Sequence, residues 1–223
     1  MQRHFDEALG KLKDMVFRMG DLVQEAIRKA VDSLEKRDIQ LAKSVVEGDQ
    51  RINVLEIEVD ELGHELIALM QPTAVDLRFI TMVLKINSDL ERMGDQAVNI
   101  AEKGIDLCGD VPAAVELGIP TMVDLAIEMV RESLKAFSER DAQKAKSICE
   151  RDDELDDLND HVRTKLEQAM HAGALRFPQA VSLLMVAHNL ERIGDLATNI
   201  AEDVIYVAKG IDIRHHITER REK

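Results

Sequence analysis

Apolar residues recur at steps of three and four through nearly the whole chain, which is the spacing of amphipathic helices. The clearest series lies between residues 52 and 69, at Ile52, Leu55, Val59, Leu62, Leu66 and Leu69. These positions form one stripe of a helix and predict a coiled-coil-like packing seam. No stretch shows the alternation of apolar and polar residues that is typical of a strand, so the pattern predicts an all-α protein.

Glycine and proline divide this pattern into six predicted helices. In the first half we expect a helix over about 3–46 that ends at Gly48, a second that ends before Gln71-Pro72-Thr73, and a third over about 74–107. In the second half we expect helices over about 121–149, 152–171 and 178–208, with a turn at 172–174 and an end at Gly210.

The two halves of the chain are copies of each other. Residues 87–102, NSDLERMGDQAVNIAE, match residues 187–202 at ten of sixteen positions, and residues 38–49 match 141–152 at seven of twelve. Gly and Pro cluster between them in CGDVPAAVELGIP. An internal repeat with such a boundary predicts two tandem three-helix bundles, residues 1–110 and 111–210, followed by a polar tail at 211–223.

Charge and composition narrow the kind of partner. A net charge of −14 repels nucleic-acid phosphates and anionic lipids, which argues against nucleic-acid binding and against direct attachment to a membrane. Two cysteines are too few for a disulfide framework or a zinc site. The start, MQRHFDEALG, is charged where a signal peptide is apolar, and no apolar run is long enough to span a bilayer. We therefore expect a cytoplasmic protein that reaches the membrane only through partners.

An acidic stripe lies on the third predicted helix of each half. Residues four apart on a helix are neighbours, so Glu91 lies beside Asp95, and Glu191 lies beside Asp195 in the second copy. Like charges at this spacing destabilise a helix by roughly 0.2–0.5 kcal/mol. A glycine inside each stripe costs about 1 kcal/mol more relative to alanine. Both costs recur at matching positions, which indicates a function for the stripe.

In two antiparallel helices, residues that are equally far from the connecting turn face each other. With the turns at Pro72 and Gly173, each acidic pair faces a second pair of side chains that carry oxygen atoms, on the preceding helix. Converging carboxylates repel one another unless a cation neutralises them, and oxygen ligands suit hard cations such as magnesium, calcium, manganese or iron. The sequence therefore predicts two metal sites, formed by Asp49, Asn53, Glu91 and Asp95 and by Asp152, Asp156, Glu191 and Asp195.

Simpler interpretations of these residues stay open. Asp49 and Asp152 follow predicted helix breaks, where an aspartate caps a helix. The acidic stripes could be solvated surfaces paired with arginines, and the two glycines could serve only close helix packing. His188, one turn before Glu191, could join the second site, although the repeat has Ser88 in its place.

A second acidic pair also recurs. Asp21 and Glu25 return as Asp124 and Glu128 on the first helix of each half. Their height on that helix places them far from the predicted metal sites. We interpret them as a solvated surface or a surface that faces a partner.

The motifs LERMGD and LERIGD, together with LAKSVVEGD, QPTAVDLRFI and IAEDVIYVAKG, resemble the PhoU family over almost the whole chain. The resemblance implies a pseudo-twofold pair of three-helix bundles, commonly a homodimer, in a family where E(D)xxxD motifs of some members bind iron or zinc clusters. Glu91 with Asp95, Glu191 with Asp195 and Asp152 with Asp156 match that motif. Asn53 departs from it because an amide replaces the last carboxylate.

The resemblance also implies a function. It suggests a non-enzymatic negative regulator of the phosphate-starvation response, which couples the high-affinity phosphate ABC transporter, through its ATPase subunit, to a phosphate-sensing membrane histidine kinase and modulates phosphate uptake. Partners would recruit it peripherally to the inner membrane. The alternatives are a carboxylate-bridged metal-storage protein or metalloenzyme, and a purely structural helical scaffold. Di-iron bundles need two ExxH motifs, and Glu61–His64 has no counterpart in the second half.

Overall fold

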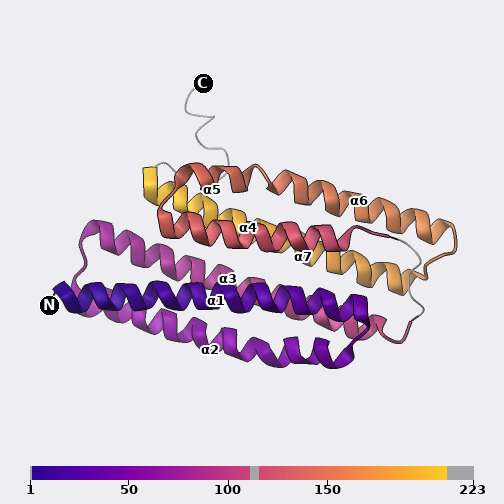
Figure 1. Ribbon diagram of the computed structural model, residues 1–223, viewed down its shortest axis with the longest axis horizontal. Coiled ribbons are helices and arrows are strands. Elements are labelled where there is room, and N and C mark those ends of the chain that lie inside the picture. The colour runs from indigo at the N-terminus through magenta and orange to yellow at the C-terminus, as the bar shows by residue number, and fades with distance from the viewer. Residues whose placement is uncertain (1, 111–115, 210–223) are drawn as a thin grey trace, which may run out of the picture.

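The computed structural model describes residues 2–110 and 116–209 and is helical almost throughout them. Its helices, labelled in Figure 1, are α1 (Gln2–Lys36), α2 (Ile39–Met70), α3 (Ala74–Leu107), α4 (Ile119–Glu139), α5 (Ala142–Cys149), α6 (Asp152–His171) and α7 (Phe177–Lys209). The described residues contain no strand, so the all-α prediction is confirmed. Gly210 and the predicted tail at 211–223 lie outside the described residues.

The helices form two three-helix bundles that lie side by side with their long axes parallel (Figure 1). The first bundle contains α1, α2 and α3. In the second, α5 and α6 together take the place of α2, between α4 and α7. The bundles join along α3 against α7 and α1 against α4.

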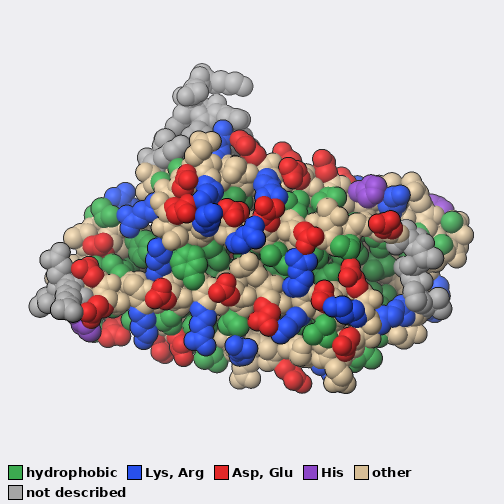
Figure 2. Space-filling model, viewed as in Figure 1, with side chains coloured by type: hydrophobic (Ala, Val, Ile, Leu, Met, Phe, Trp, Pro, Cys, Tyr) green, Lys and Arg blue, Asp and Glu red, His purple; other side chains and the backbone are tan. Residues whose placement is uncertain are grey.

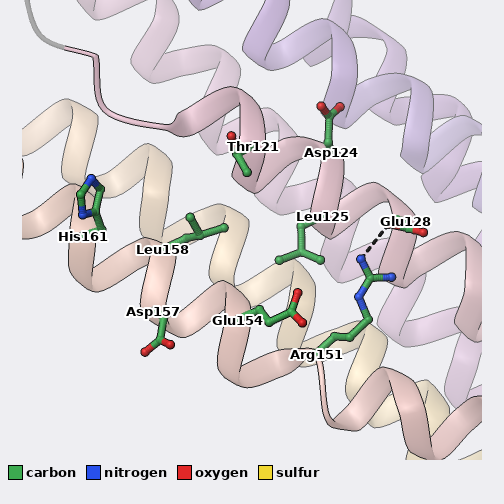
Figure 3. A pocket seen from close by; sticks show the side chains of 9 residues that line it. All are labelled: Thr121, Asp124, Leu125, Glu128, Arg151, Glu154, Asp157, Leu158 and His161. Carbon is green, nitrogen blue, oxygen red and sulfur yellow. Dashed lines mark hydrogen bonds and ion pairs between the residues drawn. The ribbon is translucent and has the colours of Figure 1, made fainter.

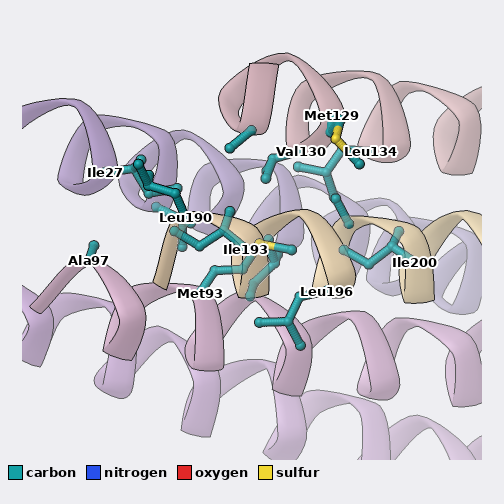
Figure 4. Packing of buried hydrophobic residues seen from close by; sticks show 14 of the residues in the cluster. Ile27, Met93, Ala97, Met129, Val130, Leu134, Leu190, Ile193, Leu196 and Ile200 are labelled. Atoms are coloured by element: carbon teal, nitrogen blue, oxygen red, sulfur yellow. The ribbon is translucent and has the colours of Figure 1, made fainter. Parts of the chain in front are cut away.

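One hydrophobic core runs through both bundles. Figure 4 shows its centre, where Ile27 of α1, Met93 of α3, Met129 of α4 and Leu190 of α7 gather between the four helices. All four side chains are fully buried. Because the centre of the joint between the bundles is apolar and buried, the two repeats are packed as one body.

The first helix ends earlier than the sequence predicts. Instead of running to residue 46, α1 ends at Lys36, and the chain turns at Arg37, whose φ is +54°. The Asp38 side chain then accepts from the backbone N–H groups of Gln40 and Leu41 and caps α2. An aspartate cap compensates for the unpaired donors at a helix start, and this signal was stronger than that of a glycine ten residues later.

Gly48 is therefore not a helix break, because α2 passes through it without interruption. The second bundle differs at this point. After the same kind of turn at Arg140 and an Asp141 cap, α5 ends at Cys149 and α6 begins at Asp152. The break falls at Glu150 and Arg151, where the first repeat has Glu47 and Gly48.

The positions of the helix caps rule out one interpretation of Asp49 and Asp152, namely that they are N-caps. Asp49 lies in the interior of α2, and Asp152 is the first residue of α6, so neither is an N-cap. The caps are Asp38 and Asp141. The turn at 172–174 is as predicted, with Gly173 at a φ of +70°.

Candidate functional site

In the first bundle, α2 brings Asp49 and Asn53 against the acidic stripe of α3. Asn53 donates from Nδ2 to Asp49 Oδ2 at 2.8 Å. A Cβ atom added to Gly94 would lie 3.2 Å from Asp49 Oδ1, so the missing side chain leaves room for this carboxylate. The two helices therefore meet in the register that the turn at Pro72 predicts.

The carboxylates of this first group disfavour one another's charge. Partial burial is the main cause that raises the pKa values of Asp49 and Glu91, and the charge of Asp95 raises both further. Glu56, one turn beyond Asn53 on α2, also raises the pKa of Glu91. The sequence analysis missed Glu56, although its i+3 spacing from Asn53 places it on the same side of α2.

Two oxygens of this group are buried without a hydrogen-bond partner. They are Oδ1 of Asp49 and Oδ1 of Asn53. Buried acceptors are normally satisfied, so each lost partner costs free energy of about 1–3 kcal/mol. A bound cation would satisfy both atoms.

In the second bundle, α6 sets Asp152 and Asp156 against Glu191 and Asp195 of α7. Burial first, and then the charges of Asp195 and Asp156, raise the pKa of Asp152 to about 6. The pKa values of Asp156, Glu191 and Asp195 are also raised, first by burial and then by neighbouring carboxylates. Four acids thus form one electrostatic group, as the repeat predicts.

His188 takes part in this second group. Its Nδ1 lies 2.8 Å from Glu191 Oε2, and its proximity lowers the pKa values of Glu191 and Asp195. The repeat has Ser88 at this position, so the two groups differ in both an imidazole and the Asn53 amide.

A cavity of about 380 Å³ opens beside the second group. Asp152 and Asp195 line it, together with Thr198, Asn199 and Glu202 from the next turns of α7. Their spacings of three, four and seven residues from Asp195 place them on the same side of α7. Two guanidinium groups, Arg192 of α7 and Arg92 of α3, also line this cavity. Arg92 belongs to the other bundle, so only the docking of the two repeats brings it here.

The donor set fits a hard cation better than a soft one. Every predicted ligand offers oxygen, and the two free cysteines are not among them. In the observed rotamers, no three His, Cys, Asp or Glu side chains of the described residues lie close enough together to hold a metal ion. A metal therefore requires side-chain rotation, which the exposed positions of Asp95 and Asp195 allow. The metal assignment stays a prediction.

Comparison with known proteins agrees with the repeat. The PhoU domain model matches twice, at residues 16–104 and 119–204. No helix among the described residues is both long and apolar enough to cross a bilayer.

Relatives match over nearly their whole length. A protein of Aquifex aeolicus named phosphate-specific transport system accessory protein PhoU homolog is 40% identical over 215 residues, which cover 96% of this chain and 97% of that protein. The Escherichia coli phosphate-specific transport system accessory protein PhoU is 31% identical, with 95% and 88% covered. The crystal structure of PhoU from Pseudomonas aeruginosa superposes with a TM-score of 0.88 at 33% identity, covering 93% of this chain and 100% of that one. The chain belongs to the PhoU family.

Proposed function

We propose that this protein is an accessory regulator of phosphate transport. The observation that carries the proposal is the match of both repeats to the PhoU domain, with relatives named as accessory proteins of a phosphate-specific transport system. These relatives align over almost their full length, which favours a shared role rather than a shared domain.

The finer proposal is a negative regulator that acts as an adapter. In this role a homodimer of the protein contacts the ATPase subunit of a phosphate ABC transporter and a membrane histidine kinase, and it keeps the kinase inactive when phosphate is plentiful. The net charge of −14 supports recruitment by proteins rather than by anionic lipid. The double bundle supports an adapter because its two packed repeats offer separate surfaces to different partners.

A bound metal is part of this proposal. Asp49 with Asn53 and Asp152 with Asp156 would hold divalent or trivalent ions against the acidic stripes of α3 and α7. The unpartnered oxygens of Asp49 and Asn53 support such a site in the first bundle. The raised pKa of Asp152 supports one in the second, because a cation would offset the burial and the repulsion that raise it. The metal would stiffen the pairing of neighbouring helices in each bundle.

Gene deletion tests the regulatory role. Without this protein, phosphate-responsive genes should be expressed in phosphate-rich medium, and uptake of labelled phosphate should change. Unchanged transcription and unchanged uptake would reject the proposal. The control is complementation by the wild-type gene from a plasmid.

Elemental analysis tests the metal. Protein purified without a chelator or a histidine tag should carry metal in a fixed ratio, and the Asp95→Ala/Asp195→Ala variant should lose it. If neither protein carries metal, the stripes are acidic surfaces and the adapter proposal stands without them.

A further inference from the structure

The two bundles carry the same groove between their first and second helices. In the second bundle, α4 and α6 enclose a cavity of about 700 Å³ lined by Thr121, Asp124, Leu125, Glu128, Arg151, Glu154, Asp157, Leu158 and His161. In the first, α1 and α2 enclose about 440 Å³ lined by Arg18, Leu22, Glu47, Gln50, Arg51, Val54, Leu55 and Glu58. Six lining positions of the first groove recur in the second, each 103 residues later.

Both grooves keep the same apolar base. Leu22 and Leu55 in the first correspond to Leu125 and Leu158 in the second. Figure 3 shows Leu125 and Leu158 pointing into the space between α4 and α6. Leucines at the base of a groove between two helices can accept an apolar side chain from outside.

The charged residues around the base differ between the copies. The first groove has two arginines and two glutamates, so its formal charge is zero. The second has four carboxylates and one arginine. Arg51 of the first groove becomes Glu154 in the second, and Val54 becomes Asp157. The larger groove is thus the acidic one.

Two of its four acids are already neutralised. Asp124 pairs with Arg28 of α1 at 2.7 Å, and Glu128 pairs with Arg151 at 2.7 Å. Glu154 and Asp157 are exposed, and no basic side chain of the described residues lies within ion-pair distance of either. Figure 3 places Glu154 beside the leucine base and Asp157 on the outer side of α6. Asp157 is left for a ligand, and so is Glu154, which Arg151 attracts only from beyond ion-pair distance.

We propose that the groove between α4 and α6 docks a basic amphipathic helix of a partner protein. An aliphatic side chain of that helix packs on Leu125 and Leu158, while lysines or arginines one turn away pair with Glu154 and Asp157. Between residues 121 and 128 the groove spans about 10 Å of α4, which is the length of two helical turns. The face of the molecule shown in Figure 2 mixes acidic and basic side chains.

Other occupants fit this groove less well. Nucleic acid and anionic lipid carry the same sign of charge as the rim. A second copy of this chain carries a net charge of −14, so the proposed homodimer would join through a surface other than this acidic groove. This proposal adds a docking site to the proposed adapter role. It rests on that role only in assuming that the protein binds partner proteins.

A labelled peptide tests the groove directly. The probe is an 18-residue amphipathic helix with leucines on one face and lysines on the other, and its control replaces every lysine with glutamate. Fluorescence anisotropy should give one site per chain for the lysine peptide, with affinity that falls as salt rises. The glutamate peptide should bind at least tenfold more weakly.

Exchange of residues between the grooves localises that site. Glu154→Arg/Asp157→Val gives the second groove the side chains of the first and should weaken the lysine peptide at least tenfold. Arg51→Glu/Val54→Asp makes the reverse exchange and should add a second site. All four residues are exposed, so both variants should fold, and circular dichroism checks this.

Equal affinity in the wild type and Glu154→Arg/Asp157→Val would overturn the proposal, as would equal binding of the two peptides. The assay contains no phosphate system. If gene deletion leaves phosphate uptake unchanged while the peptide binds selectively, the adapter role falls and the groove stands.

Discussion

Lys85 of α3 donates from Nζ to both carboxylate oxygens of Asp203 on α7, at 2.5 and 2.7 Å, across the joint between the bundles. Asp203 is only 6% exposed, whereas the Lys85 side chain is 52% exposed. A buried carboxylate without its cation is costly, so Lys85→Met should lower the free energy of unfolding by about 1–3 kcal/mol. Urea unfolding measures this.

A double-mutant cycle separates this pair from general effects. Lys85→Met/Asp203→Asn removes both charges and should be more stable than Lys85→Met alone. Lys36→Met breaks the exposed pair with Asp32 and should change stability much less than Lys85→Met does, because solvent screens an exposed pair. If the Lys85 and Lys36 variants lose the same stability, burial of Asp203 does not strengthen the pair.

The glycines of the helices should respond in opposite directions. Gly48 lies within α2, and a Cβ there would meet nothing within 4 Å, so Gly48→Ala should stabilise the protein by about 1 kcal/mol. At Gly194 a Cβ would lie 2.4 Å from Cδ2 of the fully buried Leu155. Gly194→Val should therefore destabilise it by about 2–3 kcal/mol. Thermal unfolding of both variants checks the signs, and a stabilising Gly194→Val would show that Leu155 moves aside freely.

Much of the fold follows from the sequence because its signals are periodic and repeated. The predicted apolar stripe is buried from Ile52 to Leu66 except at the half-buried Leu62. Its last position, Leu69, was predicted wrongly: it is 69% exposed, in the last turn of α2. The helix after Pro72 begins at Ala74, where the pattern predicts. The sequence also predicts that Asp49 of α2 lies opposite the helical turn of α3 that contains Gly94, because a tight connection fixes the register of two antiparallel helices.

The boundary between the first and second helices could not be predicted from the position of a glycine alone. Gly48 is a poor helix former, yet its cost of about 1 kcal/mol is smaller than what the packing of a 32-residue helix supplies. The sequence analysis also missed Arg92 beside the second acidic group, for another reason. Arg92 reaches the second acidic group only because α3 packs on α7, and no local pattern records how two repeats dock.

Asp152 should make stability depend on pH. Its folded pKa, raised to about 6, exceeds the ordinary value of 3.8, so the folded state holds a proton that the unfolded state releases. In protein freed of metal by a chelator, the Asp152 carboxyl costs no stability below about pH 4. The free energy of unfolding then falls as pH rises toward 6 and above. Asp152→Asn should therefore raise the Tm at pH 7.5, by roughly 2–4 °C for each kcal/mol relieved.

The same variant should have little effect at about pH 3.5, where Asp152 is largely protonated in the folded and the unfolded state alike. Solvent exposure of the group screens part of the repulsion, so the shift should shrink further at high salt. A Tm gain that is equal at both pH values would mean that the amide helps by some route other than charge. Asp14→Asn, which removes one carboxylate from an exposed position of α1 outside this group, is the matched control.

Exchange of Asn53 and Asp156 between the repeats should exchange their affinity for metal. Asn53 gives the first group one carboxylate fewer than the second, where Asp156 stands at the matching position. Asn53→Asp should tighten manganese binding in the first bundle about tenfold, and Asp156→Asn should weaken it in the second, because each added anionic oxygen favours a hard cation. Manganese titration followed by equilibrium dialysis measures both. Identical binding by both variants and the wild type would mean that these positions are not ligands.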